Sequence, residues 1–185
     1  FPEPVMAIIQ ERFQLTVSPA DHPPSTAEIL AGVRDAQAAI CTLNERMDAG
    51  VLSVAPALRV IANYAVGYNN IDVEAAKARG IIVTNTPDVL TNATADLTWA
   101  LILAVARRVV EGDQLVRQKQ WTGWSPTQML GVDLAGKTLG IIGMGRIGQA
   151  VARRAAGFEM NILYWSRSER PLQPANLAWQ RVSFE

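Results

Sequence analysis

The sequence predicts an α/β fold built from parallel sheets, and two observations lead to this prediction. Short apolar runs alternate with helical segments over roughly the first 85 residues, and the same alternation returns after residue 137. A strand, a helix and a second strand in this order need a crossover connection, which favours a parallel sheet with helices on its faces. The chain has 185 residues, of which 49% are hydrophobic and 18% charged, enough for one large domain or two small ones.

Composition and charge exclude several classes of protein. Seventeen basic residues balance seventeen acidic ones, whereas nucleic-acid-binding proteins usually carry a basic excess that displaces counterions from phosphates. The single cysteine, Cys41, cannot form an intramolecular disulfide. The apolar stretch at residues 99–106 is much shorter than the ~20 residues that cross a bilayer. We therefore expect a cytoplasmic protein that binds neither nucleic acid nor membranes.

The first half of the chain contains repeated strand and helix signals. Strands are expected at residues 13–17, 38–41, 58–62 and 81–84, and helices at residues 6–12, 25–36, 48–54 and 72–79. Ser25 and Glu28 form a capping box, in which each side chain satisfies an amide that the helix start leaves free. Asp72 caps a later helix, and Gly80 ends it in the left-handed conformation that glycine adopts at little cost.

Beyond Pro87 the pattern changes to one long helical stretch. Residues 93–117 carry apolar side chains three and four positions apart, and their number indicates a helix that bridges two bodies or breaks near Gly112. An irregular link rich in glycine and tryptophan follows at residues 121–136. We place a domain boundary near residue 90, which separates residues 1–90 from residues 91–185.

A glycine-rich turn opens the second parallel-sheet pattern. A strand at residues 138–142 leads into Gly143-Met144-Gly145-Arg146-Ile147-Gly148, a helix continues to Ala155, and another strand follows at residues 161–165. In this context the first glycine allows the tight turn, the second lets the backbone approach a pyrophosphate, and the third lets the helix pack on the strand. The helix start adds free amides and partial positive charge. The segment predicts a dinucleotide site that includes Gly143, Gly145, Arg146, Ile147 and Gly148; a turn without a ligand is the alternative.

The residues after the second strand of this unit indicate which dinucleotide is preferred. NAD sites place Asp or Glu there to bind the ribose 2′-hydroxyl, but this chain has Ser166, Arg167 and Ser168. A guanidinium can bind a 2′-phosphate through charge-assisted hydrogen bonds. We therefore expect NADP (NADPH) to be preferred over NAD. In the alternative, Glu169 binds the ribose and Arg167 is a solvated surface charge.

Four segments resemble motifs of the D-isomer-specific 2-hydroxyacid dehydrogenases. They are Ala65-Val66-Gly67-Tyr68-Asn69-Asn70-Ile71-Asp72, Thr84-Asn85-Thr86-Pro87, Thr94-Ala95-Asp96 and the glycine turn at 143–148. The resemblance covers essentially the whole chain and is nearest to the glyoxylate and hydroxypyruvate reductases. It implies two parallel-sheet domains, one flavodoxin-like and one Rossmann, the second incomplete in this chain. Residues 1–90 would be the substrate-binding domain without its first strand, and residues 91–185 the first half of the NAD(P)-binding domain.

The same resemblance implies roles for individual residues. The backbone amides of Val66 and Gly67 would bind the substrate carboxylate, and a turn with glycine at a strand end does expose amides that can receive an anion. A plain turn glycine is the alternative for Gly67. Thr94 would lie near the nicotinamide or its phosphate, with a helix N-cap as the alternative. Two copies would pair through the cofactor domain into a homodimer.

The residues that perform the chemistry are expected to lie outside residues 1–185. Reduction of a 2-keto acid needs a general acid, a cation and a carboxylate, which the family supplies as His, Arg and Glu from later segments. The only histidine, His22, lies in a proline-rich loop and is expected to be solvated. We therefore expect no catalytic residue and no metal site within this chain.

The overall functional prediction is a longer protein that reduces small 2-keto acids, such as glyoxylate and hydroxypyruvate, to 2-hydroxy acids with NADPH. Residues 1–185 alone are expected to be inactive. Two alternatives stay open at this point. One is a regulatory binding protein that keeps the fold and senses the cofactor, and the other is an inactive fragment.

Overall fold

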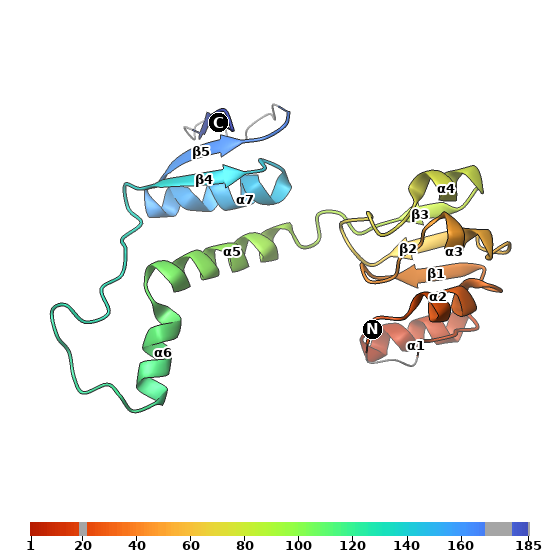
Figure 1. The fold of residues 1–185 in the computed structure, drawn as a ribbon, viewed down its shortest axis with the longest axis horizontal. Helices are drawn as coiled ribbons and strands as arrows, with labels where there is room; N and C mark the ends of the chain where they lie inside the picture. The colour runs from red at the N-terminus through yellow and green to blue at the C-terminus, as the bar shows by residue number, and fades with distance from the viewer. Residues whose placement is uncertain (19–21, 169–178, 185) are drawn as a thin grey trace. The chain divides into compact units, whose positions relative to one another are not determined.

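The computed structural model describes residues 1–18, 22–168 and 179–184. The chain divides into two compact units, residues 1–87 and residues 88–185. Within the described residues, each unit contains one sheet of three parallel strands, with the strands in chain order. Figure 1 draws the helices and strands of both units. The expected α/β fold with parallel sheets is therefore confirmed.

The first unit carries its helices and strands in alternation after an initial pair of helices. Its elements are α1 (Glu3–Arg12), α2 (Thr26–Val33), β1 (Ala38–Cys41), α3 (Ala49–Ser53), β2 (Val60–Asn63), α4 (Val73–Ala78) and β3 (Ile82–Thr84). In the sheet, Ala38 lies opposite Val60, and Val60 lies opposite Ile82. Leu52 and Ile61 are fully buried in the core between this sheet and its helices, which follows from the apolar runs in the strands.

Local capping signals act as the sequence predicts. The Glu28 amide donates to Ser25 Oγ at 3.3 Å, and the Ser25 amide donates to the Glu28 carboxylate at 2.7 Å. The hydrogen bonds from Ser25 lower the pKa of Glu28, because they stabilise the charged carboxylate. Asp72 accepts a hydrogen bond from the Ala75 amide at the start of α4, and Gly80 follows this helix with φ +68°.

One expected strand is absent. Residues 13–17 pair with no strand, and the side chains of Phe13 and Val17 are 66% and 54% exposed. Alternating polarity reports only the period of the side chains, whereas a strand also needs a partner for its backbone groups. Among the described residues, β1 is an edge strand of this sheet and pairs with β2 alone. The strand prediction for residues 13–17 is therefore wrong.

The second unit begins with a pair of helices in place of the single long helix. Its elements are α5 (Thr91–Ala106), α6 (Val109–Arg117), β4 (Thr138–Ile142), α7 (Arg146–Ala155), a short 3-10 turn (Ala156–Phe158), β5 (Asn161–Trp165) and β6 (Trp179–Arg181). Residues 120–137 form no helix or strand, in agreement with the expected irregular link. None of the helices in the described residues is long and apolar enough to cross a membrane.

The expected break is present but lies at Arg108, about four residues before Gly112, and Gly112 itself lies within α6. Arg108 adopts φ +53°, outside the helical region. The irregular link at residues 120–137 contacts the end of α5, where the Val132 amide donates to the Ala106 carbonyl at 2.7 Å. Next to it, a Cβ on Gly131 would lie 2.5 Å from the same carbonyl. The end of α5 thus finds its backbone partner in a residue distant in sequence, which no local pattern reports.

A buried tryptophan on α5 binds α7. The indole nitrogen of Trp99 donates to the Val151 carbonyl at 3.0 Å. The same ring stacks on Phe158 with centroids 4.4 Å apart and an interplanar angle of 11°. Trp99 is 4% exposed and belongs to the core that α7 and the sheet form in this unit.

We expect the substitution Trp99→Phe to lower the free energy of unfolding of this unit by about 1–2 kcal/mol, since it removes a buried hydrogen bond and part of the packed ring. Urea unfolding of the purified protein measures this change. Trp124 is 80% exposed, so Trp124→Phe is the matched control and should change stability by less than about 0.5 kcal/mol. Equal effects of the two substitutions would contradict the role assigned to the indole.

Candidate functional site

The turn between β4 and α7 is held against the end of β5. Ile142, the last residue of β4, lies opposite Trp165, the last residue of β5. The Gly143 amide then donates to the Trp165 carbonyl at 2.8 Å. Gly143 adopts φ +100°, a conformation open to glycine and strained for other residues. The chain can therefore reverse within one residue and start α7 at the edge of the sheet.

Two further glycines in this turn differ in what surrounds them. A Cβ on Gly148 would lie 2.1 Å from the Gly143 carbonyl oxygen, so no side chain fits there. A Cβ on Gly145 would meet no atom within 4 Å. Gly148 is thus required by the packing of the helix on the turn, whereas Gly145 leaves open space above the backbone. Open space at this position is what a pyrophosphate needs in order to approach the main chain.

The start of α7 is suited to bind an anion. Gln149 makes the first helical hydrogen bond, to the Gly145 carbonyl at 2.9 Å, so the amides of Arg146, Ile147 and Gly148 have no acceptor within the helix. No side chain caps this helix, and no acidic residue lies in its first turn. The free amides and the helix dipole together favour a negatively charged group. The residues present therefore fit the pyrophosphate of a dinucleotide.

The side chain of Arg146 has a partner of its own. Its Nε lies 2.8 Å from Asp88 Oδ1, with both side chains more than half exposed. The Arg146 side chain is therefore paired with Asp88, whereas its backbone amide is one of the free amides at the start of α7. The predicted contribution of Arg146 to cofactor binding stays a prediction.

The predicted nucleotide-selecting residues follow β5 directly. Ser166 is buried, and its hydroxyl donates to the Ser168 carbonyl at 2.5 Å. Arg167 lies between them and is exposed. The guanidinium of Arg181, in β6, donates to the Ser166 carbonyl at 3.0 Å. Hydrogen bonds from Ser166 and Arg181 therefore stabilise the bend after β5, while the Arg167 side chain is exposed to solvent.

Sequence analysis missed Arg181, because its position depends on the pairing of β6 with β5. Arg181 lies opposite Tyr164 in that pairing, and a strand of only three residues carries no recognisable pattern. Glu169, the alternative ribose ligand, lies outside the described residues.

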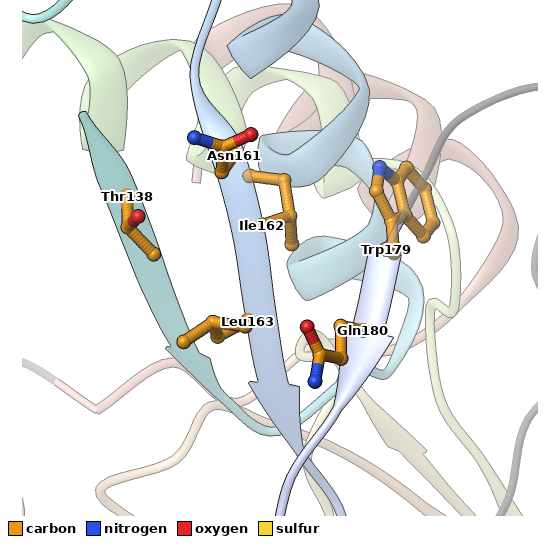
Figure 2. Close-up of a pocket in the computed structure, with 6 residues that line it drawn as sticks. All are labelled: Thr138, Asn161, Ile162, Leu163, Trp179 and Gln180. Atoms are coloured by element: carbon orange, nitrogen blue, oxygen red, sulfur yellow. The ribbon is translucent and has the colours of Figure 1, made fainter. Parts of the chain in front are cut away.

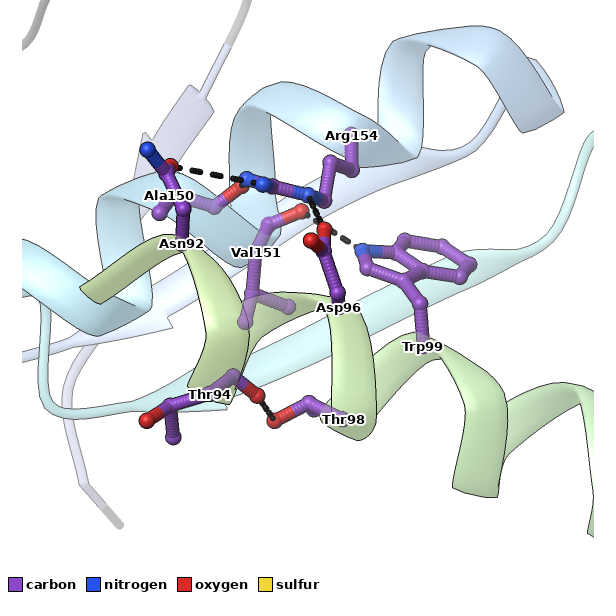
Figure 3. Close-up of polar contacts among 8 residues, drawn as sticks. All are labelled: Asn92, Thr94, Asp96, Thr98, Trp99, Ala150, Val151 and Arg154. Atoms are coloured by element: carbon purple, nitrogen blue, oxygen red, sulfur yellow. Dashed lines mark hydrogen bonds and ion pairs between the residues drawn. The ribbon is translucent and has the colours of Figure 1, made fainter. Parts of the chain in front are cut away.

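Thr94 lies in the first turn of α5, on a different face from the residues that contact α7. Figure 3 shows Asn92, Asp96 and Trp99 directed toward α7, with Thr94 and Thr98 on the other side of α5. Thr94 donates its amide to the Leu90 carbonyl, and Leu90 is the N-cap residue. The alternative role of Thr94 as an N-cap is therefore wrong.

An ion pair joins α5 to α7. Arg154, on α7, contacts Asp96 Oδ1 through Nε at 2.7 Å and Asn92 Oδ1 through Nη2 at 3.3 Å. Its Nη1 also donates to the Ala150 carbonyl at 2.8 Å, as Figure 3 shows. The Arg154 guanidinium thus connects the first turns of α5, which contain Thr94, to α7.

The first unit carries the predicted carboxylate-binding turn just after β2. Val66 is half-buried and Gly67 is exposed. Within the residues that the structure describes, the amides of Val66 and Gly67 donate to no acceptor. Two adjacent free amides near the end of a parallel strand can receive an anionic group.

The reactive side chains of the described residues show no sign of catalytic activation. Burial, with a smaller contribution from Glu45, raises the pKa of Cys41 to about 12, so its thiol stays protonated at neutral pH. His22 is exposed, and its Nδ1 lies 3.0 Å from the Pro23 carbonyl oxygen. In the described ranges, no group of three His, Cys, Asp or Glu side chains could hold a metal ion.

A hollow on the second sheet lies away from the glycine turn. It has a volume of about 570 Å³ and is lined by Thr138, Asn161, Ile162, Leu163, Trp179 and Gln180, which Figure 2 shows across the three strands. Three of these residues begin their strands, whereas the glycine turn follows the end of β4. Ligands of open parallel sheets bind at the carboxyl ends of the strands, so this hollow is no candidate for the dinucleotide.

Comparisons with known proteins give one matching family and several similar proteins. Residues 1–176 match the family described as "D-isomer specific 2-hydroxyacid dehydrogenase, catalytic domain". The chain is 53% identical over 188 residues to the glyoxylate reductase of Thermococcus kodakarensis, covering 100% of this chain and 56% of that protein. The TT0316 protein of Thermus thermophilus superimposes with a TM-score of 0.84 at 46% identity, covering 98% of this chain and 57% of that one.

Two further solved structures hold nicotinamide cofactors. An acyclic imino acid reductase in complex with NADPH and D-Arg has a TM-score of 0.81 at 27% identity, with 99% of this chain and 57% of that one covered. The D-lactate dehydrogenase of Aquifex aeolicus, complexed with NAD and lactic acid, has a TM-score of 0.68 at 29% identity, with 76% and 42% covered. The chain thus spans about half the length of the relatives it matches.

The two glycines give a direct test of the dinucleotide site. We expect Gly145→Ala to keep the stability of the protein and to weaken dinucleotide binding by about tenfold or more, since the added methyl group occupies the open space over the turn. We expect Gly148→Ala to lower the free energy of unfolding by more than about 2 kcal/mol, since its Cβ would overlap a carbonyl oxygen. Thermal unfolding and calorimetric titration with NADPH and NADH measure the two effects. A Gly145→Ala protein that binds both cofactors as the wild type does would contradict the site.

Proposed function

The chain belongs to the D-isomer-specific 2-hydroxyacid dehydrogenase family, and from this premise we propose that the full-length protein is a reductase of small 2-keto acids that prefers NADPH. Glyoxylate and hydroxypyruvate are the proposed substrates, and 2-hydroxy acids the products. The observation that carries the proposal is the turn between β4 and α7, which has open space at Gly145 and free amides at the start of α7. The glyoxylate reductase at 53% identity supports the substrate class.

The proposed work of this chain is to bind and orient the reactants. The nicotinamide cofactor, when bound, supplies a hydride to the keto carbon. The amides of Val66 and Gly67 hold the substrate carboxylate, and the glycine turn holds the pyrophosphate. Residues 1–90 would then form the substrate domain and residues 91–185 the start of the cofactor domain. The general acid and its charged partners would come from segments of the full-length protein after residue 185.

NADPH preference rests on the bend after β5. Arg167 is exposed, and the buried Ser166 and the guanidinium of Arg181 hold the bend around it. A guanidinium here suits a 2′-phosphate, and no carboxylate stands between the end of β5 and residue 169 to repel it. NAD remains the second cofactor in this proposal.

A homodimer formed through the second unit is part of the same proposal. Leu97, Leu101 and Val105 lie four residues apart along α5 and are 60%, 59% and 78% exposed. Apolar side chains at this spacing form one stripe on a helix, and an exposed stripe of this kind favours contact with another protein surface. The stripe supports a second copy of the chain as that partner.

We also place the protein in the cytoplasm, since its single cysteine leaves no disulfide to form within the chain.

We expect the full-length protein to oxidise NADPH when glyoxylate or hydroxypyruvate is added, and residues 1–185 alone to show no such activity. Steady-state absorbance assays with each keto acid and with NADPH or NADH measure this. Cofactor binding without turnover of any small 2-keto acid would favour a regulatory protein over a reductase.

We expect Arg167→Ala to weaken NADPH binding by about 10- to 150-fold, the range for one hydrogen bond to a charged group. NADH lacks the 2′-phosphate, so its affinity should change little. Calorimetric titration of both cofactors gives the ratio. Arg153 is exposed on α7, and Arg153→Ala is the control that should leave the ratio as in the wild type. An unchanged ratio in Arg167→Ala would remove Arg167 from the proposed site.

A further inference from the structure

Two asparagine side chains hold consecutive peptide groups of the turn that follows β2. Asn85 Nδ2 donates to the Val66 carbonyl at 2.8 Å. Asn63 Nδ2 donates to the Gly67 carbonyl at 2.7 Å. Asn63 ends β2, and Asn85 directly follows the last residue of β3. Neighbouring parallel strands end at the same edge of a sheet, so the two side chains reach the turn from adjacent strands.

Fixing a carbonyl also fixes the amide of the same peptide group. In a trans peptide the N–H points away from the C=O. Asn85 therefore orients the Gly67 amide through the Val66 carbonyl, and Asn63 orients the Tyr68 amide through the Gly67 carbonyl. Neither amide donates to an acceptor within the described part of the chain.

The preceding peptide group is held in the same way by the backbone. The Thr86 amide donates to the Ala65 carbonyl at 2.9 Å, which orients the Val66 amide. Like the next two amides of the turn, the Val66 amide has no acceptor among the described residues. Three successive carbonyls are thus bound while the three amides that belong to their peptide groups stay free. Donors oriented before the ligand arrives need no reorganisation when it binds.

The Asn63 side chain is itself held by Asn70, which is bound to the loop after β1. It is 2% exposed, and its Oδ1 accepts from Asn70 Nδ2 at 3.2 Å. The same Asn70 nitrogen donates to the carbonyls of Thr42 and Glu45, at 2.9 and 3.1 Å. Every buried polar side-chain atom of the described residues has a partner, as burial of an amide requires. The loop after β1 therefore fixes Asn70, and Asn70 in turn fixes the Asn63 side chain that binds the Gly67 carbonyl.

We propose that Asn63 and Asn85 are positioning residues for the substrate: they orient the amides that bind its carboxylate and do not touch the substrate themselves. This inference rests on the proposed function, since it assigns the role of the free amides at Val66 and Gly67 to a carboxylate. It also gives a function to Asn85, whose role the sequence motif around Thr84 leaves open.

The experiment uses the full-length protein and two substitutions at Asn85, which is only half-buried. Asn85→Leu keeps the size of the side chain and removes the donor, whereas Asn85→Gln keeps a donor. We expect Asn85→Leu to raise both the KM for glyoxylate and the dissociation constant of oxamate, a non-reacting analogue, by about tenfold. The NADPH dissociation constant should stay unchanged, and Asn85→Gln should recover most of the lost affinity.

The matched control is Asn44→Ala, in the same unit. Asn44 is exposed, and its side chain makes no hydrogen bond within the described residues, so its KM and oxamate affinity should equal those of the wild type. A merely structural role for Asn85 would lower the unfolding temperature and the active fraction of Asn85→Leu while leaving KM and oxamate affinity unchanged. That result would overturn the inference.

Crystal structures of the wild type and of Asn85→Leu separate this inference from the proposed function. A rotated Val66–Gly67 peptide group in Asn85→Leu supports the positioning role, and an unchanged peptide group overturns it, in either case without any turnover. A wild-type protein that binds no oxamate and reduces no 2-keto acid would refute the proposed function instead. If Asn85→Leu does not fold, Asn85→Ala, which also removes the donor, provides the same comparison.

Discussion

The close approach of α7 to the turn before it is the constraint on which the second unit depends. The Gly143 carbonyl oxygen occupies the place where a Cβ of residue 148 would stand, so the helix can start directly at the end of β4 only with glycine there. The same approach directs the first amides of α7 toward the open side of the turn. Packing and the proposed ligand binding thus use one piece of backbone, with Gly148 required for the first and Gly145 proposed for the second.

Both units place their candidate binding groups after the carboxyl ends of parallel strands. Asn63 ends β2 and the glycine turn follows β4, and in each case a neighbouring strand provides the group that holds the loop. Asn85, after β3, binds the turn near β2, and the Trp165 carbonyl of β5 binds Gly143. Parallel pairing brings these strand ends together at one edge, which explains why residues distant in sequence act on one loop.

Much of the fold follows from local chemistry. The capping box at Ser25, the cap at Asp72 and the left-handed Gly80 all act within one helical turn, and the structure contains each of them. The strand that is absent and the helix break that is displaced both depend on distant partners. Residues 13–17 alternate in polarity but find no strand to pair with, and α5 ends where Val132 supplies a partner for the Ala106 carbonyl.

The sequence by itself determined the parallel α/β class and the strand–turn–helix unit around the glycine turn, because these depend on glycine positions and periodicity within short windows. The roles of Val66 and Gly67 rest on the resemblance to the family and stay a prediction. Only the tertiary structure decided which side chains hold those groups in place. Asn85 binds a carbonyl 19 residues away, and Arg181 binds the carbonyl of Ser166 across a strand pair. Such contacts arise from the register of the sheet, and the register is set by packing of the whole unit.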